Sequence, residues 1–223
     1  MAATKKATPK IKGADKDKIL SAYREAVLRD GKEPSSVFTF CVSIGIKEEA
    51  FYEYFGSFDA IGGQIWKEYI ETVASRLQSD KNYVEFSMRE KILAFYFTLA
   101  EVLRGDRSFA LLTIKDWKNP AITPKAIRGF RSEFEGWLAP ILNEGKQNGE
   151  VAKRPLLDSQ YDGLFWMHLI FILQFWSKDD SAGFEKTDAA IEKSVNLAFD
   201  IIGKGVLDNA LDFGKFLYQN AKN

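Results

Sequence analysis

The sequence has little cysteine and little histidine: its 223 residues include one Cys and one His. One Cys excludes an intramolecular disulfide framework. One Cys and one His also cannot supply the three or four nitrogen and sulfur ligands of a structural zinc site. We therefore expect no metal and no cofactor in this protein.

Long hydrophobic runs are also missing. The most apolar stretch, Leu164 to Trp176, is interrupted by His168 and Gln174 and is shorter than the ~20 residues that a membrane-spanning helix needs. The N-terminus is rich in Lys, Thr and Ala and lacks the apolar core of ~7–15 residues that a secretory signal contains. The sequence therefore predicts no membrane segment, a buried helix in the apolar stretch and a cytoplasmic location.

Motifs of catalysis are absent as well. The Gly-Lys pairs lack the earlier glycine of a phosphate-binding loop, and no G-x-S-x-G nucleophile motif is present. No Glu-x-x-His pair indicates a di-iron helical bundle. We do not expect an enzyme.

The composition is that of a folded protein with an uneven distribution of charge. Apolar residues make up 46% of the chain and aromatic residues 14%, enough to form a substantial interior. The 31 basic and 31 acidic residues balance, yet residues 1–12 hold four Lys and no acid. We expect residues 1–12 to be a flexible basic arm, which either contacts a nucleic acid or only aids solubility.

Apolar residues recur mostly at helical spacing, and the strand-like alternation of apolar and polar residues is scarce. The sequence therefore predicts an all-α fold. The expected helices cover residues 15–29, 37–44, 47–54, a stretch from Ser57 or Asp59 to about 78, 84–104, 106–117, 123–148, 158–177, 184–204 and 206–220.

Aromatic residues are concentrated in the second half of the chain. Because small-molecule sites are concave and mostly aromatic, a subset of them could line an effector pocket, although core packing would explain the same residues. The candidate pocket residues are Phe95, Trp117, Phe130, Phe134, Trp137, Phe165, Trp166 and His168. His168 lies alone on an apolar helix and is expected to be a hydrogen-bonded core or pocket residue. The helix at 158–177 is apolar around nearly its whole circumference, so we expect a second copy of the chain to cover its outer face.

The segment Ser35 to Ile61, SSVFTFCVSIGIKEEAFYEYFGSFDAI, resembles the helix-turn-helix of TetR-family (tetracycline-repressor-like) transcription regulators. The matching features are Ser36-Val37, the turn glycine Gly45 with Ile46, and the string Phe51-Tyr52-Glu53-Tyr54-Phe55. Upstream, ILSAYREAVLRDG is similar to the first helix of the family. Downstream, ILNEG followed by Gly149-Glu150-Val151 is similar to the end of its seventh helix.

The resemblance implies a homodimer that binds double-stranded DNA and is tuned by a small apolar or aromatic effector. It further implies three parts: the basic arm at 1–12, a three-helix head with the helix-turn-helix at 13–60, and a helical domain for ligand binding and dimerisation at 61–223, with a long helix joining the last two. In this family the second helix of the motif lies in the major groove. The implied DNA-binding residues are Lys5, Lys6, Ser36, Lys47, Glu48, Tyr52 and Tyr54.

The segment departs from the family pattern in its charge. Its groove-facing helix contains Glu48, Glu49 and Glu53 beside a single Lys47. Duplex DNA is a dense polyanion, and non-specific affinity comes largely from cations that neutralise its phosphates. A carboxylate facing a phosphate at ~4 Å costs about 1 kcal/mol even in bulk water.

The same segment also has unexpected apolar residues. Phe58 stands where the family has a lysine that contacts phosphate, and Phe38 and Val42 lie beside the usual apolar stripe. If all three are exposed, they would suit a surface that faces a protein. A second hypothesis is therefore a protein of this fold whose head no longer binds operator DNA and acts as a protein-interaction or ligand-binding module.

Overall fold

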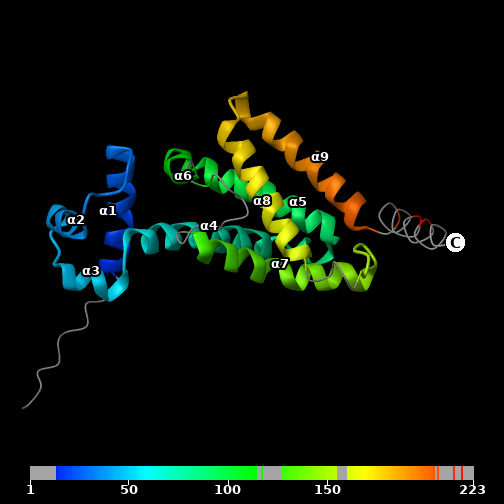
Figure 1. Cartoon of the computed structure of the whole chain (residues 1–223), viewed down its shortest axis with the longest axis horizontal. Helices are drawn as coiled ribbons and strands as arrows, with labels where there is room; N and C mark the ends of the chain where they lie inside the picture. Colours follow the sequence, from blue (N-terminus) through cyan, green and yellow to red (C-terminus); the bar gives the residue numbers. More distant parts are fainter. Residues whose placement is uncertain are drawn as a thin grey trace, which may run out of the picture.

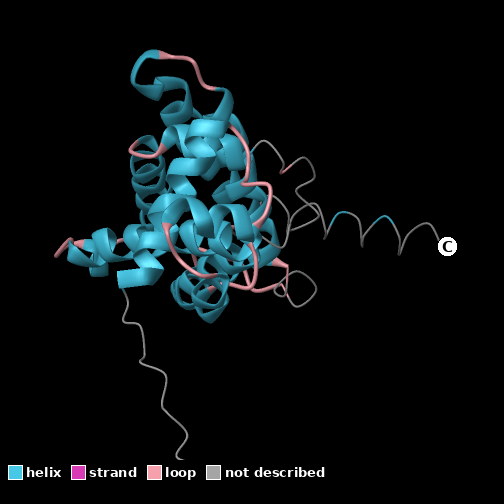
Figure 2. Ribbon diagram, turned by 90° about the vertical axis from the view of Figure 1, so that its left-hand side faces the viewer, coloured by secondary structure: helices cyan, strands magenta, loops and turns pink. Residues whose placement is uncertain are grey.

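The computed structural model describes residues 14–114, 117, 127–154, 160–203, 205, 213 and 217, and every regular element within them is helical (Figures 1 and 2). The predicted all-α class is confirmed. The elements are α1 (Ala14–Asp30), α2 (Val37–Ile44), α3 (Glu48–Tyr54), α4 (Phe58–Ser79), the 3-10 turn η1 (Tyr83–Glu85), α5 (Met88–Arg104), α6 (Arg107–Ile114), α7 (Arg128–Asn148), α8 (Tyr161–Lys178), the 3-10 turn η3 (Ala182–Phe184) and α9 (Glu185–Ile202).

Figure 1 shows α1, α2 and α3 grouped at one end of the molecule. Helix α4 leaves this group and runs into the remaining helices, where it packs against α5 and α7. Helices α8 and α9 form an antiparallel hairpin at the other end, and α9 packs against α5. We call α1–α3 with the first turn of α4 the head, and the helices from α5 onward the body.

The core of the head is built from a few aromatic rings. Phe40 of α2 and Phe51 of α3 meet edge-on, with ring centroids 6.2 Å apart. Phe58, the first residue of α4, contacts both rings and also stacks on Tyr23 of α1 at 5.6 Å. Large aromatic rings bury enough apolar surface to hold short helices together. The four rings therefore join all four helices that meet in the head.

The helix boundaries follow from local capping. The Ser57 side chain accepts a hydrogen bond from the backbone N–H of Ala60 at 3.2 Å and so starts α4. Gly149 ends α7 in a left-handed conformation with φ +80°, which glycine adopts without strain.

The helix predicted at 84–104 begins later, at Met88. The reason is a capping box: the Ser87 side chain accepts from the N–H of Glu90, and the Glu90 carboxylate accepts from the N–H of Ser87. The backbone before it forms the 3-10 turn η1 instead.

The helix predicted at 106–117 is shorter at both ends than expected. Asp106 belongs to the preceding turn, where its side chain accepts hydrogen bonds, and α6 ends at Ile114. Trp117 is not helical, because its indole is buried against Trp66 of α4. The predicted starts of α7 at 123 and of α8 at 158, and most of the helix predicted at 206–220, lie outside the described residues.

The end of α7 and the start of α5 fit closely together. Both carboxylate oxygens of Glu150 accept from the first backbone N–H groups of α5, those of Met88 and Arg89, at 3.0 and 3.3 Å. A side chain at Gly145 would collide with Met88, so only glycine permits this approach. Within the described residues, no helix is both long enough and apolar enough to cross a membrane.

Candidate nucleic-acid interface and ligand-binding core

Helices α2 and α3 form the candidate nucleic-acid interface. Helix α2 starts where the Ser36 hydroxyl accepts from the backbone N–H of Thr39 at 3.2 Å. It ends at Gly45, whose φ of +69° lies in the left-handed region and turns the chain toward α3. Two bonds close this turn, from the N–H groups of Gly45 and Ile46 back to the carbonyls of Val42 and Cys41. The sequence motif is therefore built as a turn between two short helices.

The predicted DNA-binding residues of α3 differ in their accessibility. Lys47, at the N-cap of α3, and Tyr52 are exposed. The ring of Tyr52 rests edge-on against Phe51 at 5.3 Å, which fixes its direction. Glu48 is half-buried beside α2, where its charge adds to the effect of burial in raising the pKa of the Cys41 thiol. Tyr54 is half-buried and packs against the core.

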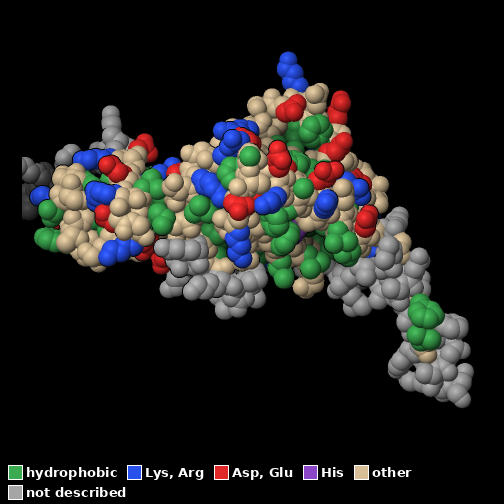
Figure 3. Space-filling model, turned by 90° about the horizontal axis from the view of Figure 1, so that it is seen from above, with side chains coloured by type: hydrophobic (Ala, Val, Ile, Leu, Met, Phe, Trp, Pro, Cys, Tyr) green, Lys and Arg blue, Asp and Glu red, His purple; other side chains and the backbone are tan. Residues whose placement is uncertain are grey.

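Two carboxylates lie on the exposed surface of α3, those of Glu49 and Glu53. Among the described residues, the ion pairs of the head join Arg24 to Asp106 and Arg29 to Asp30, and none includes Glu49 or Glu53. On the face drawn in Figure 3, acidic and basic side chains are interspersed over the head and the body alike. The described part of α3 therefore presents more negative than positive charge.

Of the three unexpected apolar residues Phe38, Val42 and Phe58, two are exposed. Phe38 and Val42 are 62% and 64% exposed, one turn apart on α2. Phe58 is half-buried, because its ring fills the space between Tyr23, Phe40 and Phe51. The condition that all three are exposed is therefore not met, and the exposed apolar surface of the head consists of Phe38 and Val42 without Phe58.

The basic arm at residues 1–12, with Lys5 and Lys6, lies outside the described residues.

The body contains a continuous group of aromatic rings, which we call the aromatic cluster. It includes six of the eight predicted pocket residues, and it is joined by Trp66 of α4. Its members are Trp66, Phe95, Trp117, Phe130, Phe134, Trp137 and Trp166. Phe95 and Trp137 stack at 4.1 Å, and Trp66 and Trp117 lie 4.6 Å apart. Rings from four helices and the stretch after α6 thus meet in one place.

Within the part of the chain that the structure describes, one buried polar atom of the aromatic cluster lacks a hydrogen-bond partner. Trp166 is 2% exposed, and its indole N–H has no acceptor among the described residues. A buried donor left without a partner costs about 1–3 kcal/mol. By contrast, the indole N–H of Trp66 donates to the hydroxyl of Thr113 at 3.1 Å. Among the described residues of the cluster, the indole N–H of Trp166 is thus a buried donor that remains unsatisfied.

The other two predicted pocket residues, Phe165 and His168, face α9. Phe165 contacts the ring of Phe199. His168 lies between α5 and α9, with its Nδ1 3.2 Å from the hydroxyl of Tyr96 and its Nε2 2.8 Å from the hydroxyl of Ser194. Burial lowers the pKa of His168 to about 4. His168 is therefore neutral at pH 7.

The hydrogen bonds also fix the tautomer of His168. Tyr96 is buried, and among the described residues His168 is the acceptor available to its hydroxyl, so the Tyr96 O–H donates to Nδ1. The Nε2–H then donates to Ser194, whose own hydroxyl donates to the carbonyl of Ile191 at 3.3 Å. Because Nε2 carries the proton, it cannot accept one from Ser194. The chain of bonds ties three helices together and does not activate a nucleophile.

An apolar face remains uncovered on the α8–α9 hairpin. Five large side chains are exposed along its two helices: Leu164, Met167, Phe171, Leu197 and Ile201. On α8 they recur at spacings of three and four residues, so they share one side of the helix. Helix α8 is therefore apolar on two sides, of which one packs inside the body and the other lies on its surface.

The sequence did not single out Asp106 or Arg107, which connect distant parts of the chain. Asp106 accepts from Tyr69 of α4 and from Arg24 of α1. Arg107 donates to two backbone carbonyls at the end of α8. The sequence gives no signal for these roles, because the partners of both residues are far away along the chain.

Comparisons with known proteins agree with this architecture. Residues 91–217, more than half of the chain, match the family described as tetracyclin repressor-like, C-terminal domain. Among curated proteins, none matches the sequence significantly.

Solved structures with the same fold share little sequence with this chain. A Syntrophomonas wolfei protein, described as a TetR-family transcriptional regulator, superposes with a TM-score of 0.67 at 14% identity, covering 86% of this chain and 97% of its own. The fatty acid degradation regulator FadR of Bacillus halodurans gives 0.59 at 16% identity, covering 81% and 97%. FadR of Bacillus subtilis, solved in complex with stearoyl-CoA, gives 0.57 at 20% identity, covering 86% and 99%.

Proposed function

The chain belongs to the tetracycline-repressor-like (TetR) family of transcription regulators, and from this membership we propose that it binds double-stranded DNA as a homodimer and responds to a small apolar or aromatic effector. The observation that carries the proposal is the turn between α2 and α3, closed at Gly45, which leaves Lys47 and Tyr52 exposed. We assign the head at 13–60 to DNA binding and the domain at 61–223 to ligand binding and dimerisation.

In this proposal α3 enters the major groove. The proposed contacts come from Lys5, Lys6, Ser36, Lys47, Glu48, Tyr52 and Tyr54. Lys47 and the arm lysines supply the positive charge that the phosphates require. Glu48 could accept from the exocyclic amine of cytosine. Glu49 and Glu53 oppose binding, so the affinity for random DNA has to come from Lys47 and the arm lysines and should therefore depend strongly on salt.

The effector site in this proposal is built on the aromatic cluster, with Phe165 and His168 at its side toward α9. Aromatic walls with few polar groups are typical of small-molecule sites. The unpaired indole N–H of Trp166 supports an effector that carries a carbonyl or another hydrogen-bond acceptor. Such a ligand would satisfy the donor, and a hydrocarbon would leave it unpaired.

A second copy of the chain is the proposed cover of the exposed apolar face on α8 and α9. Exposed apolar surface of this kind typically marks an interface. In a two-fold dimer, the same face of each copy would pack against the other.

A titration of random duplex DNA tests the DNA-binding proposal. Fluorescence anisotropy at low salt should show a Kd in the micromolar range or below. The logarithm of the affinity should fall with the logarithm of the salt concentration, with a slope of about −0.9 for each neutralised phosphate. No binding at low salt would rule out a DNA-binding head.

A pair of ligands of nearly equal shape tests the effector proposal. Acetophenone carries a carbonyl and isopropylbenzene does not. Calorimetry should show tighter binding of acetophenone to the native chain, and Trp166→Phe should remove this preference because it keeps a ring and loses the N–H. Stearoyl-CoA is a further probe, since the FadR structure contains it. If none of the three binds, the body is not an effector site for this chemistry.

One observation favours a second function, a head that contacts a protein. Phe38 and Val42 are exposed where the head needs no apolar residue, and Glu49 and Glu53 have no cationic partner among the described residues. A flat DNA titration together with ligand binding in the body would favour this second function over the first.

A further inference from the structure

Two neighbouring residues of the α5–α6 turn hold different ends of the molecule. Asp106 reaches toward the head. Its Oδ2 accepts from Arg24 of α1 at 2.8 Å and from the hydroxyl of Tyr69 of α4 at 2.5 Å. Next to this bond, Phe109 of α6 contacts the ring of Tyr23 and lies under the guanidinium of Arg24, whose Cζ is 5.5 Å from the ring centre. Helix α1 is therefore tied to the start of α6 by both charge and packing.

Arg107 reaches the other way, to the tip of the α8–α9 hairpin. Its Nη1 donates to the carbonyl of Trp176 at 3.2 Å, and its Nη2 donates to the carbonyl of Asp179 at 3.0 Å. The guanidinium lies between the rings of Trp176 and Phe184, with its Cζ 4.5 Å from each ring centre. A planar guanidinium that stacks on two rings and donates to two carbonyls has one well-defined position.

The tip itself is firmly joined to α9. The Oδ2 atom of Asp179 accepts from the N–H and the hydroxyl of Thr187 at 2.8 and 2.6 Å. Its Oδ1 atom accepts from the N–H and the hydroxyl of Ser181 at 2.8 and 2.6 Å. Phe184 is held in a left-handed conformation, with φ +65°, which is rare for an aromatic residue. A movement of the tip is thus also a movement of α9.

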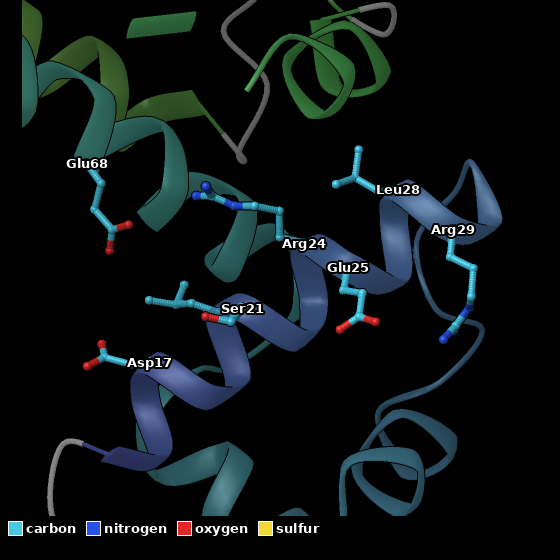
Figure 4. Close-up of a pocket in the computed structure, with 8 residues that line it drawn as sticks. Asp17, Ser21, Arg24, Glu25, Leu28, Arg29 and Glu68 are labelled. Carbon is cyan, nitrogen blue, oxygen red and sulfur yellow. The ribbon is translucent and has the colours of Figure 1, made fainter. Parts of the chain in front are cut away.

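An open groove beside α1 leaves space for this helix to shift. A groove of about 850 Å³ runs along α1 and is lined by residues of α1 and α4, among them Leu20, Leu28 and Glu68. Figure 4 shows Arg24 extending from α1 across this side, toward α4. Because the groove is open, α1 is not packed against α4 along this side. On this side, the bond from Arg24 to Asp106 ties α1 to the body directly.

We propose that Asp106 and Arg107 form a link that couples the position of the head to the tip of the α8–α9 hairpin. One peptide bond separates the two residues, and Figure 1 shows α6 lying between α1 and the hairpin. A displacement of the tip pulls on Arg107, and Asp106 transmits it to Arg24 and α1. The two are positioning residues: they touch neither the proposed DNA nor the proposed effector. The link does not depend on which ligand moves the hairpin.

Amide hydrogen exchange of the full chain, measured peptide by peptide, tests this link. Arg107→Gln removes the stacked, forked cation from the tip. We expect exchange in the α1 peptides, residues 14–30, to rise at least three-fold, although Arg107 does not touch α1. Arg107→Lys keeps the charge and should restore part of the protection. Lys186→Gln is the matched control, because it removes the ion pair to Asp180 at the same tip and leaves Arg107 in place.

A second variant separates coupling from general destabilisation. Asp106→Asn cuts the link on the head side and should raise exchange in α1 by itself. If the link is real, adding Arg107→Gln to Asp106→Asn should change α1 exchange by less than two-fold further, because effects along one route are not additive. Val195→Ala creates a cavity beside α9 and shows how exchange rises in each peptide when the whole fold is destabilised.

Two outcomes would overturn the proposal. In the first, Arg107→Gln loosens only the tip and leaves α1 as protected as in the native chain. In the second, the increases in α1 exchange caused by the two substitutions multiply in the double variant. The proposal also fails if exchange in α1 rises only in proportion to exchange in α7, as expected for Val195→Ala.

Discussion

The head and the body use their aromatic residues in opposite ways. In the head, four rings form the core and the proposed functional surface lies outside them, on Lys47, Tyr52 and the carboxylates of α3. In the body, the proposed ligand site is itself part of the buried core. Function and stability are therefore separable in the head and coincide in the body. Substitutions can be chosen to test that contrast.

The largest effect is expected in the body. Phe130 is fully buried and contacts Trp66, Trp117 and Trp166. Phe130→Ala should lower the free energy of unfolding by about 3–5 kcal/mol, since it removes a buried ring and leaves a cavity. Tyr52→Ala, on the surface of the head, should change it by less than about 0.5 kcal/mol. Urea unfolding followed by circular dichroism measures both.

A loss below 1 kcal/mol for Phe130→Ala would contradict this contrast. It would mean that the aromatic cluster contributes little to the stability of the body, so function and stability would be separable there too.

The next largest effect depends on pH. His168 has a pKa of about 4 in the folded chain, against an ordinary value of 6.5 in the unfolded chain. Between these values the unfolded state binds the extra proton, so stability falls as the pH is lowered from 6.5 to 4 and is fully present above 6.5. At roughly 1.4 kcal/mol per pKa unit, the loss from this residue reaches about 3 kcal/mol.

His168→Gln provides the control for this prediction. Its amide can replace both hydrogen bonds, to Tyr96 and Ser194, and it does not titrate. The difference between the unfolding free energies of the native chain and the variant, followed from pH 7 to pH 4, isolates the histidine. A difference that stays constant over that range would mean that His168 is not held neutral by burial.

Replacing one glycine in the head and one in the body by alanine should change the stability in opposite directions. Gly45 closes the turn of the head with φ +69°, and Gly136 lies exposed inside α7 with open space around it. Gly45→Ala should cost about 1–2 kcal/mol, because a left-handed conformation crowds the Cβ. Gly136→Ala should add about 0.5–1 kcal/mol, because alanine loses less entropy in a helix. Thermal unfolding of each variant gives the sign directly.

If the two glycine variants changed the stability in the same direction, the prediction would be wrong. If both stabilise, the backbone at Gly45 does not need its left-handed conformation, and the turn between α2 and α3 is not the fixed element described here.

The same contrast explains how much could be predicted from the sequence. The bounds of α2, α3 and α4 were predicted within one or two residues, because Ser36, Gly45 and Ser57 are local signals that act on their own neighbours. In the body the start of α5 was missed although Ser87 and Glu90 have the spacing of a capping box. The capping box ends the preceding 3-10 turn and starts α5 four residues after the predicted start at 84.

The contacts of the body could not be predicted in the same way. Trp66 joins the aromatic cluster through Trp117 and Phe130 and donates to Thr113, 47 residues away, and nothing near Trp66 in the sequence indicates these partners. The same holds for the bond between Arg24 and Asp106, which crosses from the head to the body. The burial of Phe58 could not be predicted either, because the three rings that receive it belong to three other helices.

The smallest effect on stability is expected at the carboxylates of α3, and it gives the sharpest test of the contrast. Glu49→Gln with Glu53→Gln should change the free energy of unfolding by less than about 0.5 kcal/mol, because both side chains are exposed and have no ion-pair partner among the described residues. If α3 lies against DNA, the double variant should bind random duplex roughly thirty-fold more tightly at low salt, since two carboxylate–phosphate repulsions of about 1 kcal/mol each are relieved. Glu71→Gln, on α4, is a control that removes charge away from α3. An affinity that rises equally with Glu71→Gln would mean that only net charge matters, and α3 would have no special place against the duplex.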